Sequence, residues 1–235
     1  MRSQSVYVLI HSPLVGPLTW NLVAQEMRSR GQDVLVPVLE DSPASGNPYW
    51  KQHVESVSRS LASLSESTPV TLVGHSGAGP LLPVIRQSIT NRIKAYIFVD
   101  AGIPRPEASR LDLMKSEDPE WAAEFEAELK QGITFPGWSF DDLQEVLPDE
   151  SVRRQMISEL RPRGLTFFTE PIPVFEGWPD APCIYIQFSR AYDQPAALAM
   201  EKGWIVEPLK AGHFHMLVDP GAVTDRIIDS LDRIR

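Results

Sequence analysis

The segment GHSGA at residues 74–78 carries the strongest chemical signal in the sequence. Small residues around a serine are typical of a nucleophile elbow, a sharp strand-to-helix turn that exposes the serine hydroxyl. An apolar run at 70–73 precedes this segment, and a helical pattern follows it. These surroundings favour Ser76 as a nucleophile over an ordinary glycine-rich turn after a strand.

A serine hydroxyl needs a base, and a group that orients the base, before it can attack a carbonyl. Asp193 and His213 each follow an apolar, strand-like run in the last third of the chain. The order Ser76, Asp193, His213 matches the order in α/β proteins that carry a nucleophile elbow. Because each residue follows a predicted strand, all three should gather at one end of the sheet. The sequence therefore predicts a catalytic triad of these residues.

Two of these assignments have competitors. His215 lies two residues after His213 and is the alternative base. The two histidines together form a metal-like pair, but no third ligand stands nearby in sequence, so we expect no metal. Asp100 ends the fourth predicted strand and is the alternative to Asp193 as the acid.

The elements that must position these residues alternate along the chain. Amphipathic helical patterns separate apolar, strand-like runs at 6–10, 34–39, 70–73, 95–99, 183–188 and 204–206. This alternation predicts an α/β fold with a mostly parallel sheet of about six strands and helices on both faces. Pro37 should place the second run at a sheet edge or shorten it. Asp219 and Pro220 mark the start of the last helix.

Residues 104–182 interrupt the alternation with helical patterns and proline-rich loops but no convincing strand. We expect a helical cap here, inserted between the two parts of the core at 1–103 and 183–235. Its many aromatic residues either form the cap's own small core or line an apolar pocket, and both can hold for different residues. His53, on the polar side of its predicted helix, is expected at the surface.

Composition limits the classes of partner. The net charge of −9 argues against nucleic acid, because a phosphate-binding surface needs clustered lysine and arginine. No apolar run approaches the ~18 residues of a membrane span, and the N-terminal run is shorter than a signal peptide requires. The single cysteine, Cys183, allows no internal disulfide. We expect a cytoplasmic protein that acts on a small molecule without a cofactor, and its oligomeric state stays open.

The chain resembles the α/β-hydrolase superfamily over nearly its whole length. The resemblance is carried by VYVLIHSPLVGPLTW, VTLVGHSGAG, the aspartate after CIYIQFS, and AGHFHMLVDP. It is similar in particular to plant methylesterases and hydroxynitrile lyases, in a compact form without the two N-terminal strands common in the superfamily. The resemblance implies Ser76 as nucleophile, His213 as base and Asp193 as acid.

The resemblance also implies an oxyanion hole, for which the Gly77 amide is the first donor. Such hydrolases usually have His-Gly-x after the first strand, and the amide of x is the second donor. This chain reads HSPL at residues 11–14, and Pro13 has no N–H. We therefore expect Leu14 or the Ser12 hydroxyl to contribute, or the hole to be incomplete.

Three functions follow, in order of preference. The first is a serine hydrolase that cleaves a small or medium, apolar carboxylic ester, thioester or lactone through an acyl-enzyme on Ser76. The second is a lyase in which His213 deprotonates a substrate hydroxyl and the serine is not acylated. The third is a ligand-binding protein with little turnover, for which Pro13 is the main support.

Overall fold

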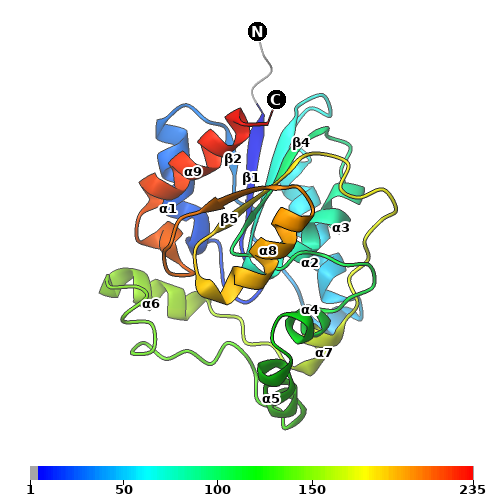
Figure 1. The fold of residues 1–235 in the computed structure, drawn as a ribbon, viewed down its shortest axis with the longest axis vertical. Helices are drawn as coiled ribbons and strands as arrows, with labels where there is room; N and C mark the ends of the chain where they lie inside the picture. Colours follow the sequence, from blue (N-terminus) through cyan, green and yellow to red (C-terminus); the bar gives the residue numbers. More distant parts are fainter. Residues whose placement is uncertain (1–4, 235) are drawn as a thin grey trace.

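Six parallel strands form one sheet in the computed structural model, which describes residues 5–234 (Figure 1). In chain order they are β1 (Val6–Ile10), β2 (Val34–Leu35), β3 (Val70–His75), β4 (Ile93–Val99), β5 (Cys183–Gln187) and β6 (Ile205–Pro208). Across the sheet the order is β2-β1-β3-β4-β5-β6, and every neighbouring pair is parallel. The predicted α/β fold with a six-stranded parallel sheet is confirmed.

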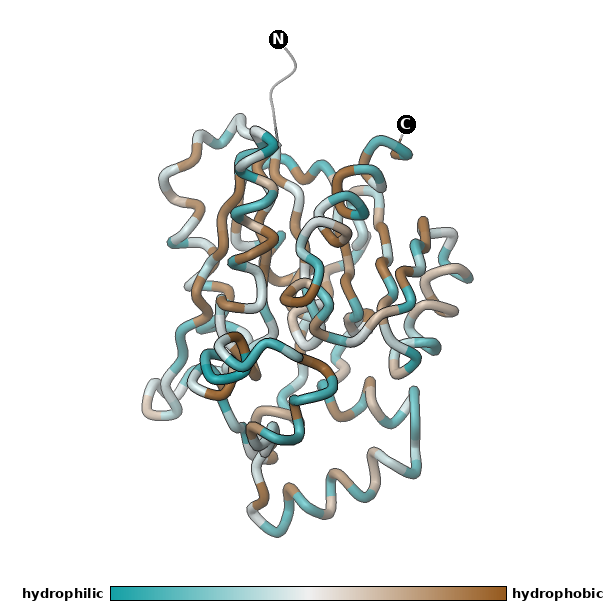
Figure 2. The backbone as a smooth tube through the Cα atoms, turned by 90° about the vertical axis from the view of Figure 1, so that its left-hand side faces the viewer, coloured by the Kyte–Doolittle hydropathy of each residue, from teal (hydrophilic) through white to brown (hydrophobic). Residues whose placement is uncertain are grey.

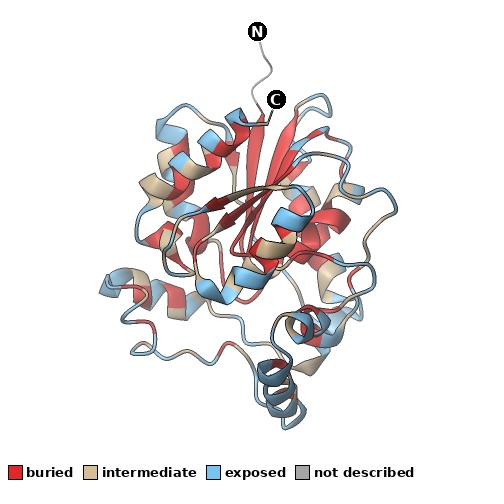
Figure 3. Ribbon diagram, in the orientation of Figure 1, coloured by how far each residue is buried: buried red, intermediate tan, exposed pale blue. Residues whose placement is uncertain are grey.

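Helices cover both faces of the sheet. The helices α1 (Leu18–Ser29) and α9 (Pro220–Asp232) pack on one face, and α2 (Tyr49–Leu61), α3 (Leu82–Gln87) and α8 (Asp193–Glu201) pack on the other. Neighbouring β1 residues separate accordingly, because Val8 joins the core on the α2 side and Leu9 joins the core on the α1 side. A sheet covered on both faces explains the continuous apolar runs. Most residues of β1, β3, β4 and β5 are buried (Figure 3). Hydrophobic stretches run through the middle of the molecule in Figure 2.

Prolines set several element boundaries, as the sequence indicates. β2 has two residues and lies at the sheet edge, short of Pro37. Pro83 lies in the first turn of α3, where its missing N–H leaves no helical bond unmade. Asp219 caps α9 by accepting a hydrogen bond from the Ala222 N–H at 2.9 Å.

The segment between β4 and β5 lies at the carboxyl ends of the strands (Figure 1). It contains α4 (Arg110–Glu117), α5 (Pro119–Lys130), α6 (Glu150–Glu159) and α7 (Leu165–Thr169). Phe125, Phe167 and Phe168 form a small hydrophobic cluster there with Leu14 of the core. Some aromatic residues of the segment therefore do build a local core of their own.

A buried polar cluster joins this segment to the core. Arg163 donates hydrogen bonds to both carboxylate oxygens of Asp41, at 2.8 and 2.6 Å. Asp41 is also bonded to His53 Nε2 at 2.9 Å, and His53 is fully buried with its ring against Phe167. The expectation of a surface His53 is therefore wrong, because Arg163 and Phe167 of the segment between β4 and β5 lie over this side of α2.

Candidate active site

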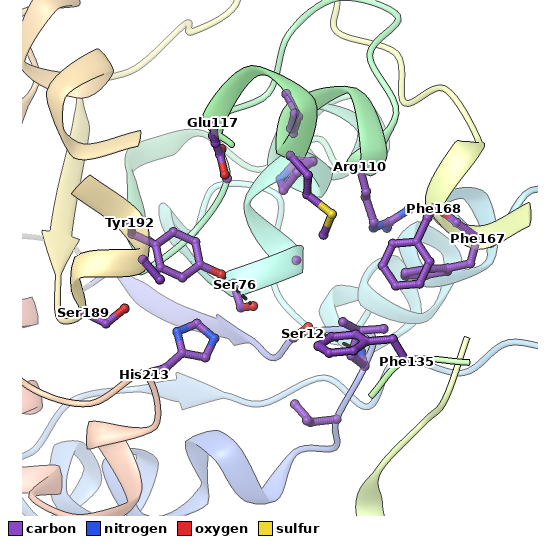
Figure 4. Close-up of a pocket in the computed structure, with 18 of the residues that line it drawn as sticks. Ser12, Ser76, Arg110, Glu117, Phe135, Phe167, Phe168, Ser189, Tyr192 and His213 are labelled. Atoms are coloured by element: carbon purple, nitrogen blue, oxygen red, sulfur yellow. Dashed lines mark hydrogen bonds between the residues drawn. The ribbon is translucent and has the colours of Figure 1, made fainter. Parts of the chain in front are cut away.

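Ser76 stands at a strained turn directly after β3. Its φ is +54°, in the left-handed region that non-glycine residues rarely adopt. A short 3₁₀ helix, Ser76–Leu81, begins there. The motif itself is tightly packed, since a Cβ on Gly74 would lie 3.2 Å from Leu82 Cδ2 and 3.3 Å from the Ala78 carbonyl oxygen. The close packing explains the small residues of the motif, and the turn directs the Ser76 hydroxyl into a pocket (Figure 4).

His213 lies in the loop after β6, and its ring stands beside Ser76 in Figure 4. Its Nδ1 donates a hydrogen bond to Asp100 Oδ2 at 3.1 Å. His75 supports it from below, because His75 Nε2 donates to the His213 carbonyl oxygen at 3.0 Å. Burial and the neighbouring His213 hold the pKa of His75 well below its usual value. His75 is therefore a neutral support for the loop that carries His213.

Asp100 is fully buried at the end of β4, with φ +41°. Its carboxylate accepts hydrogen bonds from the Phe188 N–H at 2.6 Å, and from the Ser189 N–H at 3.1 Å and hydroxyl at 2.7 Å. Together with the bond from His213, these contacts satisfy a charge that would be very costly to bury alone. Asp100 thus joins β4, the loop after β5 and the histidine.

The expected pairing of Asp193 with His213 is absent from the structure. Asp193 is exposed at the start of α8, and its carboxylate accepts a hydrogen bond from Gln187 Nε2 at 2.5 Å. A 3₁₀ turn, Arg190–Tyr192, precedes it and leaves its side chain on the outer surface. Of the two candidate carboxylates, the structure brings Asp100 to the histidine.

His215, the alternative base, also lies outside the pocket. The His215 ring packs edge-on against Phe188, with the ring centres 6.0 Å apart. His215 does not line the pocket and makes no hydrogen bond to a carboxylate among the residues that the structure describes. His213 is the histidine that stands beside Ser76.

Tyr192 is a site residue that the sequence reasoning missed. Its hydroxyl shares a hydrogen bond with Ser76 Oγ at 3.3 Å. Its ring stacks on His213, with the ring centres 5.1 Å apart and the planes inclined by 6°. Burial raises the pKa of Tyr192, so the hydroxyl keeps its proton at neutral pH. The only sequence signal is its place beside Asp193, in a loop expected to reach the site.

The loop after β1 faces the elbow. A Cβ on Gly77 would lie 3.2 Å from Ser12 Oγ, so the glycine allows the two segments to approach closely. The Leu14 N–H points to the same Ser12 Oγ at 3.4 Å. His11 fixes this loop, since its Nδ1 bonds the Ser12 carbonyl oxygen at 2.9 Å and its Nε2 accepts from the Leu39 N–H at 3.2 Å.

The pocket above Ser76 has a volume of about 350 Å³. This lies near the lower end of the ~300–1,000 Å³ usual for small-molecule sites. Its lining is mostly apolar and includes five aromatic residues from the segment between β4 and β5: Trp121, Phe135, Trp138, Phe167 and Phe168. Part of the aromatic content of this segment therefore forms pocket wall. The described residues contain no group of three His, Cys, Asp or Glu side chains that could hold a metal ion.

Comparison with known proteins agrees with this geometry. Residues 7–226 match the sequence model of the alpha/beta hydrolase family. The chain belongs to this family. A carbendazim-hydrolysing esterase from Nocardioides sp. (strain SG-4G) is 24% identical over 248 aligned residues, which cover 94% of this chain and 97% of that esterase.

Solved structures of other proteins share the fold. One is an extracellular alpha/beta-hydrolase from a Paenibacillus species, with a TM-score of 0.74, 18% identity and coverage of 96% of this chain and 98% of that one. Another is tomato methylketone synthase I in complex with 2-tridecanone, with a TM-score of 0.75, 15% identity and 99% coverage of both chains. At these identities the likeness concerns the fold alone.

The burial of His11 predicts that the stability of this alpha/beta hydrolase depends on pH. Burial lowers the pKa of His11 from 6.5 to about 4. Below pH 6.5 the unfolded chain binds a proton that the native protein excludes, so stability should fall as the pH drops from 6.5 to 4. This residue alone should contribute a loss of about 3 kcal/mol. Urea denaturation at a series of pH values would measure it.

The matched variant is His11→Gln, whose amide can still donate and accept but does not titrate in this range. Its unfolding free energy should fall less steeply with decreasing pH than that of the wild type. An identical slope in both proteins would show that His11 is not the titrating group.

Proposed function

We propose that this alpha/beta hydrolase is a carboxylic ester hydrolase that works through Ser76, His213 and Asp100. The observation that carries the proposal is the hydrogen bond from His213 to the buried Asp100, beside a serine on a strained elbow. The named relatives support it, since they include the Nocardioides esterase and a polyneuridine aldehyde esterase.

In the first half of the reaction, Ser76 Oγ attacks the ester carbonyl and His213 Nε2 accepts the serine proton. Asp100 holds the Nδ1–H tautomer and stabilises the imidazolium that forms. His213 then gives the proton to the departing alcohol, and the acyl group stays on Ser76. In the second half, water attacks the acyl-enzyme, with His213 again transferring the proton, and the carboxylic acid leaves.

The oxyanion hole in this scheme has an unusual composition. The Gly77 N–H lies in the first turn of the 3₁₀ helix, where it has no helical partner. Pro13 has no N–H to add, and the Leu14 N–H points to Ser12 Oγ. We assign the second donor to the Ser12 hydroxyl, which lies against Gly77. Loss of one oxyanion-hole donor lowers kcat on the order of 10²–10³-fold in a known case. A hydroxyl donor in place of a backbone N–H is therefore expected to affect the rate.

Tyr192 is suited to act on the leaving group. The alcohol oxygen must lie close to both Ser76 Oγ and His213, and the Tyr192 hydroxyl is bonded to the first and its ring is stacked on the second. A tyrosine that keeps its proton can donate a hydrogen bond to this oxygen while His213 delivers the proton.

The substrate we propose is a small or medium ester with an apolar, ring-bearing or branched portion. The aromatic and aliphatic lining of the pocket favours such a group. Two proteins to which the chain is similar are named as a carbendazim-hydrolysing esterase and a pyrethroid hydrolase, which supports a small-molecule substrate. We propose that residues 104–182 form the cap that supplies this lining.

A lyase on the same residues is the second candidate, and Pro13 is the observation that favours it. In a lyase His213 would deprotonate a substrate hydroxyl, which the Ser12 hydroxyl could orient, and no acyl group would form on Ser76. Trapping an acyl-enzyme on Ser76 separates the two reactions.

The cytoplasmic location stays a prediction. Within residues 5–234 no helix is long and apolar enough to cross a bilayer.

The first test is covalent labelling of Ser76. Wild-type protein treated with a fluorophosphonate should gain the mass of one adduct, because an activated serine attacks phosphorus as it attacks a carbonyl carbon. Ser76→Ala should gain none, and Ser158→Ala, which removes an exposed hydroxyl that does not line the pocket, should still be labelled. Folded wild-type protein that stays unlabelled would contradict the hydrolase and move the lyase ahead.

The second test compares the two carboxylates. Asp100→Asn keeps the shape of the side chain but removes the charge that holds the histidine tautomer, and kcat should fall by about 10³–10⁴. Asp193→Asn changes an exposed group that does not contact His213, and kcat should change by less than about twofold. Circular dichroism controls for folding. A large loss of kcat in Asp193→Asn together with a small loss in Asp100→Asn would restore Asp193 as the acid.

The third test concerns Tyr192. Tyr192→Phe should lower kcat/KM for alkyl esters, whose alkoxide leaving groups are strongly basic, by about ten- to a hundredfold, the value of one hydrogen bond to a charged oxygen. For nitrophenyl esters, whose leaving group needs little assistance, the loss should be small. Equal losses for both esters would instead place the hydroxyl at the oxyanion or at the serine alone.

A further inference from the structure

Glu117 is an unpaired carboxyl group on the wall of the apolar pocket. It is the last residue of α4, and Figure 4 shows its side chain directed toward Tyr192. Within residues 5–234 its carboxylate makes no hydrogen bond or ion pair. The nearby cations are engaged elsewhere, because Lys115 pairs with Glu126 at 2.7 Å and Arg105 donates to the Asp112 carbonyl oxygen at 3.0 Å.

The surroundings of Glu117 disfavour an ionised carboxylate. Burial raises its pKa from 4.5 to about 7, although the charge of Arg105 opposes this shift. The carboxyl end of a helix adds a further unfavourable interaction for a negative charge. The attraction between a carboxylate in such a place and a cation that enters the pocket is stronger than it would be for a carboxylate in water.

The other charged residue of the pocket wall differs in this respect. Arg110 pairs with Glu170 at 3.0 Å, and its guanidinium lies 4.0 Å from the centre of the Phe167 ring. Its charge is thus compensated by the protein itself. Glu117, by contrast, lines the cavity without a hydrogen bond or ion pair to any of the described residues.

We infer that Glu117, with the aromatic side chains of Tyr192 and Trp121, forms a subsite for a cationic nitrogen in the alcohol portion of the substrate. The inference rests on the proposed ester hydrolysis. Both aromatic residues line the same pocket, and the faces of aromatic rings attract ammonium groups. The alcohol lies on this side because it must receive its proton from His213, on which Tyr192 stacks.

A pair of isosteric esters tests this subsite. One is a choline ester, and the other is the same ester with carbon in place of the ammonium nitrogen, which keeps the shape and removes the charge. Above the pKa of Glu117, the wild type should prefer the choline ester by about tenfold in kcat/KM, the equivalent of one modest ionic contact.

Glu117→Gln should remove this preference by lowering kcat/KM for the choline ester far more than for the uncharged ester. The matched control is Glu124→Gln, which removes an exposed carboxylate of the cap that does not line the pocket. The control should keep the preference. A preference that is absent in the wild type, or that survives in Glu117→Gln, would overturn the inference.

Binding to Ser76→Ala separates this inference from the proposed function. The tryptophan fluorescence of the pocket, to which Trp121 and Trp138 contribute, would report binding of the two esters without turnover. If the wild type hydrolyses neither ester, the choline ester should still bind more tightly, and the difference should vanish on adding Glu117→Gln. In that case the cation subsite stands although neither ester is a substrate, and the labelling of Ser76 decides separately whether the protein is a hydrolase. Equal binding of both esters would overturn the subsite.

Discussion

The buried Asp100 carboxylate is the interaction on which the site depends. A carboxylate with no solvent access must be compensated by several donors, and here they come from different parts of the chain: the two residues after β5 and His213 after β6. These hydrogen bonds hold the carboxyl ends of β4, β5 and β6 in fixed positions relative to one another. The charge that orients the imidazole therefore also holds the loops that carry it.

The sheet and its helices could be predicted from periodicity, because apolar runs and amphipathic patterns record which faces are buried against the nearest layer. The same reasoning failed for His53. A helical pattern indicates burial against the sheet, whereas His53 is buried by the segment between β4 and β5. It is bonded to Asp41, which no local pattern connects with it. Contacts between distant polar residues have no period, so sequence patterns do not contain them.

Within the site, the elbow at Ser76 was predictable because its strain requires small neighbours, which leave a visible motif. The choice between Asp100 and Asp193 was not. Both follow a strand, and both strands end at the same edge of the sheet. The outcome depends on the backbone of each turn. Asp100 has a left-handed backbone conformation, and its side chain is directed inward, whereas the 3₁₀ turn before Asp193 leaves that side chain at the surface. The same turn places Tyr192 against Ser76, where the sequence gives no warning of it.

The position of the acid has a consequence for how the site can change. With the histidine held from β4, residues 190–193 no longer have to supply a carboxylate at a fixed point. That stretch of chain is free to vary in length and side chains, within the limit that Phe188 and Ser189 keep their bonds to Asp100. Selection can then act on this side of the pocket while Ser76, His213 and Asp100 stay unaltered. These three residues and the pocket wall beside them are thereby open to separate evolutionary histories.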